Sequence, residues 1–128
     1  MNSDKPVGVE PGPAVLDREA LVEQVGGDAA LLLRLVEIFN SDSATTLRTI
    51  REGLAQGNAQ TVERAAHRLK GALGALAAMA AYEAALWLET VGREGDLAGA
   101  HGAWAALQHE LGRLEPELAD AARADQSA

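Results

Sequence analysis

Apolar residues recur every three or four positions through most of this chain, which is the period of an amphipathic α-helix. The clearest stripe lies between residues 28 and 57 and consists of Leu32, Leu35, Val36, Phe39, Leu47, Ile50 and Leu54. Asp28 can cap the start of this helix, and Gly57 and Asn58 mark its end and the next cap. The pattern therefore predicts one long helix over this stretch.

The same period and the same punctuation predict four further helices. The expected segments are about 17–25, 59–77 and 79–91, then a loop at 92–95 and a last helix that begins at a cap, Asp96. In the last segment Leu97, Trp104, Leu111 and Leu118 are seven residues apart, as in a heptad seam. Pro116 is expected to kink or end that helix, because proline cannot donate the backbone hydrogen bond, unless Glu115-Pro116 begins a new turn.

Proline placement and composition define the fold class. The 102 residues between Pro13 and Pro116 contain no proline, and residues that favour strands are sparse. Short loops between helices of this length make neighbours antiparallel. We therefore predict an all-α fold, an antiparallel four-helix up-down bundle with a short additional N-terminal helix. The expected division is a disordered leader at 1–15, the bundle at 16–120 and a flexible C-terminal tail at 121–128.

Charge and cysteine content exclude several function classes. The 128 residues carry 11 Lys and Arg against 19 Asp and Glu, so the net charge of −8 argues against a nucleic-acid binder. The absence of cysteine excludes disulfides and thiol chemistry. No signal peptide is visible, and the uncharged stretch 71–82 is too short to span a bilayer. We expect a cytoplasmic protein without a membrane partner.

Candidate chemistry gathers in the third helix. On a helical wheel, His67, Gly71 and Gly74 lie away from the apolar stripe, and Lys70 lies on the flank beside His67. Glycine inside a helix is unfavourable by roughly 0.5–1 kcal/mol relative to alanine. Because both glycines face outward, we expect them to make room for a visiting surface.

The charges around His67 agree with this interpretation. Arg64, Arg68 and Lys70 surround it, and no acidic residue occurs from 64 to 82 in an otherwise acidic chain. A neutral imidazole is a nucleophile, and a neighbouring ammonium can neutralise the oxygens of an incoming phosphoryl group. Taken alone, the pattern leaves an ordinary surface histidine as the alternative. His101 and His109 show no metal-ligand spacing and are expected to have ordinary roles on a helix surface.

A resemblance favours the functional interpretation. The run AHRLKGA at 66–72 resembles the signature of histidine-containing phosphotransfer (HPt) domains, which reads His-x-x-Lys-Gly followed by small residues. Leu88-Glu89 and the segment GREGDL at 92–97 are similar to the next helix end and loop of that family. The chain departs from the pattern at Ala75, where the family often has a polar residue, and at Ala77, where it usually has glycine.

The resemblance implies a monomeric carrier in the phosphorelays of bacterial two-component signalling. His67 would accept a phosphoryl group from a receiver-domain aspartate and pass it to another receiver aspartate. Lys70 would stabilise the phosphate and Gly71 would give the partner access, with Arg64, Arg68 and Gly74 on the contact surface. The resemblance implies no cofactor of the chain's own. The Mg²⁺ needed for transfer is expected in the receiver domain, because the sequence suggests no carboxylate cluster near His67.

Two alternatives from other classes stay open. A helical adaptor could bind receiver domains or another signalling protein without carrying phosphate. A homodimer could form through the apolar surface that Met79, Tyr82 and Leu86 add to the fourth helix, unless the N-terminal segment covers this surface. No nucleotide-binding motif is present, so we expect a stoichiometric carrier that does not phosphorylate itself.

Overall fold

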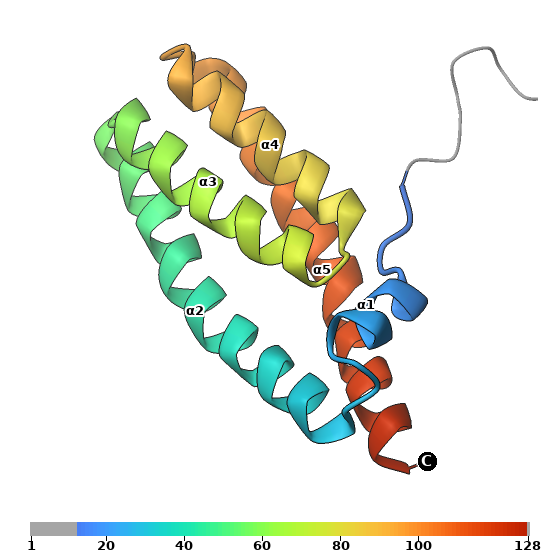
Figure 1. The fold of residues 1–128 in the computed structure, drawn as a ribbon. Coiled ribbons are helices and arrows are strands. Elements are labelled where there is room, and N and C mark those ends of the chain that lie inside the picture. The colour runs from blue at the N-terminus through green and yellow to red at the C-terminus, as the bar shows by residue number, and fades with distance from the viewer. Residues whose placement is uncertain (1–12, 128) are drawn as a thin grey trace, which may run out of the picture.

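The computed structural model describes residues 13–127, and this range forms five α-helices and no strand (Figure 1). The helices are α1 (Arg18–Gln24), α2 (Ala29–Gln56), α3 (Ala59–Ala75), α4 (Met79–Arg93) and α5 (Leu97–Ser127). The prediction of an all-α fold is therefore confirmed.

Local capping explains where the helices begin. The side chains of Asp17, Asp28 and Asn58 each accept a hydrogen bond from the backbone N–H three residues later, at 3.0–3.1 Å. Such caps satisfy N–H groups that have no partner inside the helix. The predicted ends of α3 and α4 were less accurate. α3 ends at Ala75 and not Ala77, and α4 continues to Arg93, so the loop expected at 92–95 is shorter.

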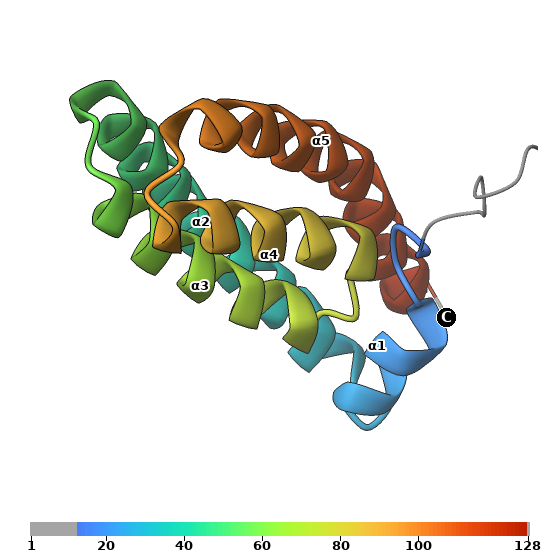
Figure 2. The same cartoon turned by 90° about the horizontal axis from the view of Figure 1, so that it is seen from above.

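The four long helices enclose one hydrophobic core, and α1 lies across one end of them (Figure 2). α3 packs between α2 and α4, and α5 packs against α4 and α2. The largest fully buried side chains include Leu32, Ile50, Leu69, Leu73, Leu88, Leu107 and Leu114. Backbone contacts hold α1 at the α3–α4 turn, because Asp17 N–H donates to Ala77 O at 3.1 Å.

The α5 helix is longer than predicted. Residues 121–128 were expected to form a flexible tail, but α5 continues through Ser127, and Ala121 and Ala122 are buried. Pro116 lies inside the helix and does not end it. Its missing N–H leaves the carbonyl of Gly112 without its usual helical partner. Gly112 and Pro116 are both exposed, so water can take that place.

The expected leader is only partly described. Residues 1–12 lie outside the described range, so the prediction of disorder there stays a prediction. Ala14 and Val15, which were also assigned to the leader, belong to the fold. Ala80 N–H donates to Ala14 O at 3.2 Å, and Val15 packs against the core. Among the described residues, no helix is long and apolar enough to cross a membrane.

The α3–α4 turn holds a residue in an uncommon conformation. Ala77 has a φ of 59°, in the left-handed region that favours glycine. Ala78 N–H donates to Leu73 O at 3.0 Å and Ala77 N–H donates to Gly74 O at 3.1 Å, the hydrogen bonds of a Schellman motif. This turn reverses the chain and brings α4 back along α3.

Candidate functional site

Helix α3 presents His67 to solvent. Its buried residues, Val62, Ala65, Ala66, Leu69 and Leu73, recur at helical spacing and face the core. The opposite surface therefore carries His67, whose side chain is 67% exposed. Lys70 follows after three residues, close to His67 on the helix surface, and its side chain is only 19% exposed.

A close approach of backbones places α4 beside this surface. Gly92 is buried, and a Cβ atom there would lie 3.0 Å from the backbone nitrogen of Glu63 on α3. Glycine at this position thus lets the two helices meet without an intervening side chain. One turn further along each helix, Glu89 of α4 meets His67 of α3, so residue numbers rise along α3 as they fall along α4. The two helices are antiparallel at the site.

Glu89 is the centre of a network of charged side chains. Its Oε2 lies 2.8 Å from His67 Nδ1 and accepts a hydrogen bond from Arg93 Nη2 at 3.0 Å. Its Oε1 lies 2.8 Å from Lys70 Nζ. The contact between Lys70 and Glu89 is an ion pair without the geometry of a directed hydrogen bond. Arg93 Nε also donates to Oε2 of Glu63 at 3.2 Å. The buried carboxylate, 5% exposed, therefore meets three basic side chains.

Two opposing effects set the protonation of Glu89. Burial alone raises the pKa of its carboxyl, because the charged form loses water. The contacts with Lys70 and His67 outweigh this effect and hold the pKa below the ordinary glutamate value. Glu89 is therefore ionised at neutral pH and can only accept hydrogen bonds. His67 must then donate from Nδ1, which leaves the lone pair of the neutral ring on Nε2.

The two outward glycines of α3 have different surroundings. A Cβ atom added to Gly71 would have nothing within 4 Å, so Gly71 leaves open space next to Lys70. A Cβ atom on Gly74 would lie 3.4 Å from Cε2 of Tyr82 on α4. The expected open surface is thus present at Gly71, whereas Gly74 lies against a neighbouring helix. The wheel missed this difference because it describes one helix and not its neighbours.

The family model described as "Hpt domain" matches residues 34–117, which are 84 of the 128 residues. The chain belongs to the Hpt domain family. Hpt domains are phosphocarrier modules of two-component phosphorelays that interact with the receiver domains of response regulators. Separate searches of the curated proteins and of the solved structures find no match to the chain.

The part of the chain that matches the Hpt family includes the predicted site residues. His67, Lys70 and Gly71 lie within the matched range, and the structure brings the first two together around Glu89. Lys70 was expected to be available to an incoming phosphate. In the structure it is paired with Glu89, so a phosphoryl group on His67 would compete with this carboxylate for Lys70.

The predicted contact residues Arg64 and Arg68 lie beside His67. Both are exposed and, with His67, line a shallow pocket between α2 and α3. Its remaining walls are Asp42, Thr45, Thr46, Thr49, Thr61 and Ala65. The pocket therefore offers guanidinium groups next to the imidazole, whereas the hydroxyls of Thr46 and Thr49 donate to backbone carbonyls of α2.

Sequence reasoning missed Glu89 as the partner of His67 and Arg93 as a second cation on Glu89. The expectation that no carboxylate cluster lies near His67 overlooked Glu89, although the described residues contain no group of three or more potential metal ligands. One signal was available. Glu89 is one residue from Leu88 and four from Ala85, both on the apolar face of its helix, and a buried acid needs a partner.

The apolar surface of α4 is only partly covered. Tyr82 is half-buried beside Gly74, but Met79, Leu86 and Trp87 are 38%, 39% and 47% exposed. The backbone contact of Ala14 with Ala80 covers one edge. Part of this apolar surface therefore stays accessible in the described residues, as a docking surface requires.

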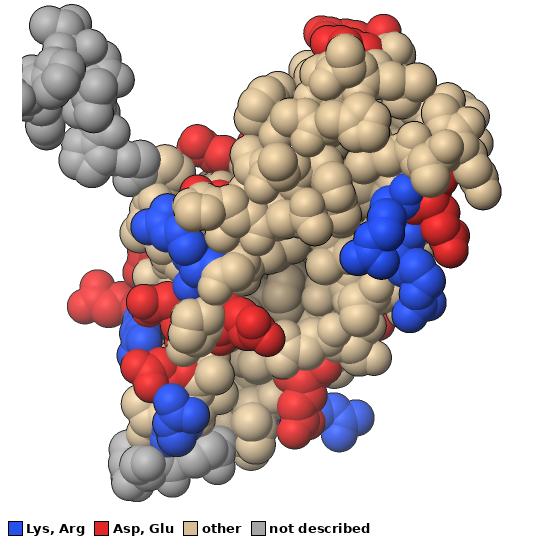
Figure 3. All heavy atoms as spheres, turned by 180° about the vertical axis from the view of Figure 1, so that it is seen from behind, with Lys and Arg blue, Asp and Glu red and all other residues tan. Residues whose placement is uncertain are grey.

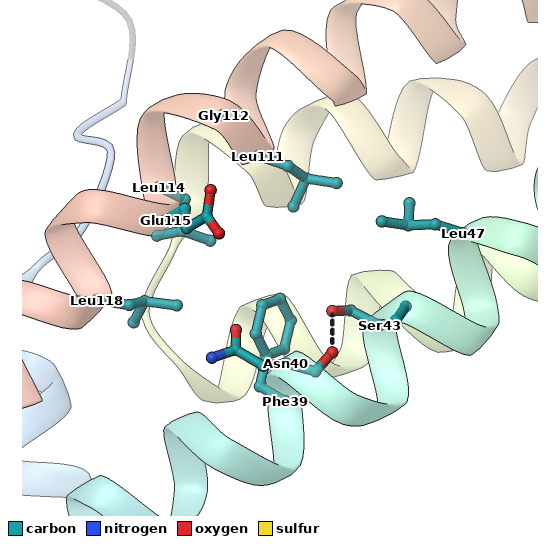
Figure 4. Close-up of a pocket in the computed structure, with 10 residues that line it drawn as sticks. Phe39, Asn40, Ser43, Leu47, Leu111, Gly112, Leu114, Glu115 and Leu118 are labelled. Carbon is teal, nitrogen blue, oxygen red and sulfur yellow. Dashed lines mark hydrogen bonds between the residues drawn. The ribbon is translucent and has the colours of Figure 1, made fainter.

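A second groove lies between α2 and α5 and does not involve the histidine. Seen from behind, the molecule has a central hollow, with mostly uncharged side chains above it and acidic side chains beside and below it (Figure 3). Figure 4 shows Phe39, Leu47 and Leu111 projecting into the groove between the two helices. Glu115 is the one charged residue among those that line the groove. The lining contains no histidine and no basic side chain, so it differs in chemical character from the surface around His67.

Proposed function

We propose that His67 accepts a phosphoryl group from a receiver-domain aspartate through Nε2 and passes it to another receiver aspartate. The observation that carries the proposal is the contact between His67 Nδ1 and the ionised Glu89 at 2.8 Å. This contact fixes the neutral ring with its proton on Nδ1, so Nε2 is the nucleophile of a largely exposed side chain. A histidine without such a partner would populate both tautomers.

Neighbouring residues have supporting roles in this proposal. Lys70 screens the negative charge of the transferring group, and Gly71 lets the receiver surface come close to the ring. Arg64 and Arg68 contact the partner. The partner supplies Mg²⁺, which shields the phosphoryl oxygens. The chain acts as a stoichiometric carrier and does not phosphorylate itself from ATP.

The proposal includes the arrangement in which the carrier works. We infer that α2 to α5 form an antiparallel up-down bundle, which the short connections and the register of α3 against α4 support. We also infer that the carrier is a monomer that acts in the cytoplasm. Open surface beside exposed His67 supports the monomer, because a receiver domain can reach this histidine without a second copy of the chain.

Phosphoryl transfer from a phosphorylated receiver domain tests the proposal. The wild-type chain should acquire an acid-labile, base-stable label, and His67→Gln should acquire none. His101→Gln is the matched control, because His101 is an exposed histidine on α5, outside the network, and should leave labelling unchanged. If the wild type binds receivers but no receiver labels it, the chain is an adaptor and not a carrier.

A further inference from the structure

The contact between Glu89 and His67 lies on the ring nitrogen that does not carry the phosphoryl group in the proposed function. Glu89 Oε2 accepts from Nδ1 at 2.8 Å, and its carboxylate is nearly inaccessible to water. Phosphorylation at Nε2 leaves the Nδ1 side of the ring unchanged. The same carboxylate therefore also faces the ring of phosphohistidine, and this inference rests on the proposed function.

The electron balance of transfer shows why the Nδ1 proton matters. When Nε2 attacks phosphorus, the bond from phosphorus to the aspartate oxygen breaks and its electrons return to the carboxylate. The ring keeps its proton on Nδ1 and becomes a cationic phosphoimidazolium. When the next aspartate attacks phosphorus, the electrons of the N–P bond return to Nε2. With Nδ1 protonated, the group that leaves is neutral imidazole, whereas without that proton it is the imidazolate anion, a much poorer leaving group.

We propose that Glu89 keeps phosphorylated His67 protonated at Nδ1, so that the phosphohistidine remains ready to donate its phosphoryl group. Under this proposal Glu89 is a positioning residue that also determines the donor strength of the carrier. An opposite charge within hydrogen-bond distance favours the charged form of an ionisable group, and low exposure limits screening by solvent. Neither the incoming nor the outgoing transfer then needs a proton to move.

Other charges near the ring act in both directions. The charged groups near it are Asp42 from α2, Glu63, Arg64, Arg68 and Lys70 from α3, and Glu89 and Arg93 from α4. The cations oppose a proton on Nδ1, but Lys70 is paired with Glu89 and Arg93 with both Glu89 and Glu63, so two carboxylates offset these two cations. Glu89 has the direct contact with Nδ1, so we expect its effect to dominate.

The test is an NMR titration of the phosphorylated full-length chain. Phosphoramidate serves as the phosphoryl donor, the chain is labelled with ¹⁵N-histidine, and the Nδ1 and ³¹P shifts are followed over a pH series. Glu89→Gln keeps an oxygen that can accept from Nδ1 but removes the charge. Glu83→Gln is the matched control, because it makes the same change at an exposed position of α4.

The proposal predicts a higher protonation midpoint of phosphohistidine in the folded wild type than in the same chain unfolded in urea. Glu89→Gln should lower the midpoint by about one pH unit or more, and Glu83→Gln should leave it unchanged. At a pH above the wild-type midpoint, phosphoryl transfer to a receiver should be slower from Glu89→Gln than from the wild type, by roughly tenfold for each pH unit between the two midpoints.

The outcomes separate this inference from the proposed function. Equal midpoints in the folded and unfolded wild type overturn the inference, and this comparison does not depend on whether Glu89→Gln folds. Equal midpoints in folded Glu89→Gln and the wild type also overturn it. A wild type that takes no phosphoryl group on His67 from phosphoramidate or from any receiver overturns the proposed function itself.

Discussion

At the scale of single residues, Glu89 shows how a buried charge becomes part of a surface site. A carboxylate that is 5% exposed would be expensive to ionise in isolation, and its contacts with three basic side chains compensate for the lost water. The arrangement orders His67 and Lys70 together, because one side chain holds both. The position of the His67 ring thus depends on a residue from another helix.

The depressed pKa of Glu89 predicts how stability changes with pH. Because the folded-state pKa lies below the unfolded value, the ionised carboxylate stabilises the fold above the unfolded glutamate pKa of about 4.3. This contribution is lost as the pH falls through the lower, folded-state pKa. Urea unfolding over a pH series should therefore show a larger free energy of unfolding for the wild type than for Glu89→Gln at neutral pH. This difference should shrink in acid. A stability difference that does not change with pH, or one matched by Glu83→Gln, would contradict the assignment.

At the scale of helices, the α3–α4 turn sets the register that brings Glu89 to His67. The turn holds Ala77 at a φ of 59°. A residue with a Cβ atom is disfavoured in this region by about 1–2 kcal/mol, whereas glycine is not. The family usually has glycine at this position, so the departure noted in the sequence has a physical meaning. It concerns the stability of the turn and not the surface that a partner would meet.

Replacing this alanine with glycine should therefore stabilise the protein. Ala77→Gly relieves the left-handed strain but adds freedom to the unfolded chain, so we expect a net gain of about 0.5–1 kcal/mol. The midpoint of urea unfolding measures the gain, and phosphoryl transfer should not change. Ala75→Gly, at the exposed last residue of α3, is the control and should lose up to about 1 kcal/mol. Destabilisation by both variants would show that Ala77 is not strained.

The same scale shows how far the sequence could predict the structure. Helix starts were predictable because Asp17, Asp28 and Asn58 cap their own helices through local hydrogen bonds. His67 and Lys70 were predictable as neighbours because three residues separate them on one helix. The contact with Glu89 was not predictable, because it depends on how α4 packs against α3. Pro116 does not end α5, because the carbonyl that loses its backbone hydrogen bond belongs to an exposed residue and can bind water.

At the scale of the whole molecule, the charge around His67 contrasts with the charge of the chain. The net charge is −8, yet Arg64 and Arg68 are exposed beside the histidine. A phosphorylated receiver presents a negatively charged acyl phosphate. The local positive field would therefore orient a partner that the rest of the surface repels.

This arrangement predicts that the rate at which a phosphorylated receiver meets the chain depends on where the basic residues lie and not on the net charge. The double variant Arg64→Gln and Arg68→Gln should lower kcat/KM for transfer from a phosphorylated receiver by roughly tenfold at low salt. The loss should shrink as ionic strength rises, because salt screens exposed charges. The matched control is Arg48→Gln with Arg51→Gln, which changes the net charge equally on exposed positions of α2 outside the pocket beside His67. Stopped-flow transfer over a salt series measures both pairs. If the two pairs slow transfer to the same extent, net charge governs the encounter and the basic surface at His67 has no steering role.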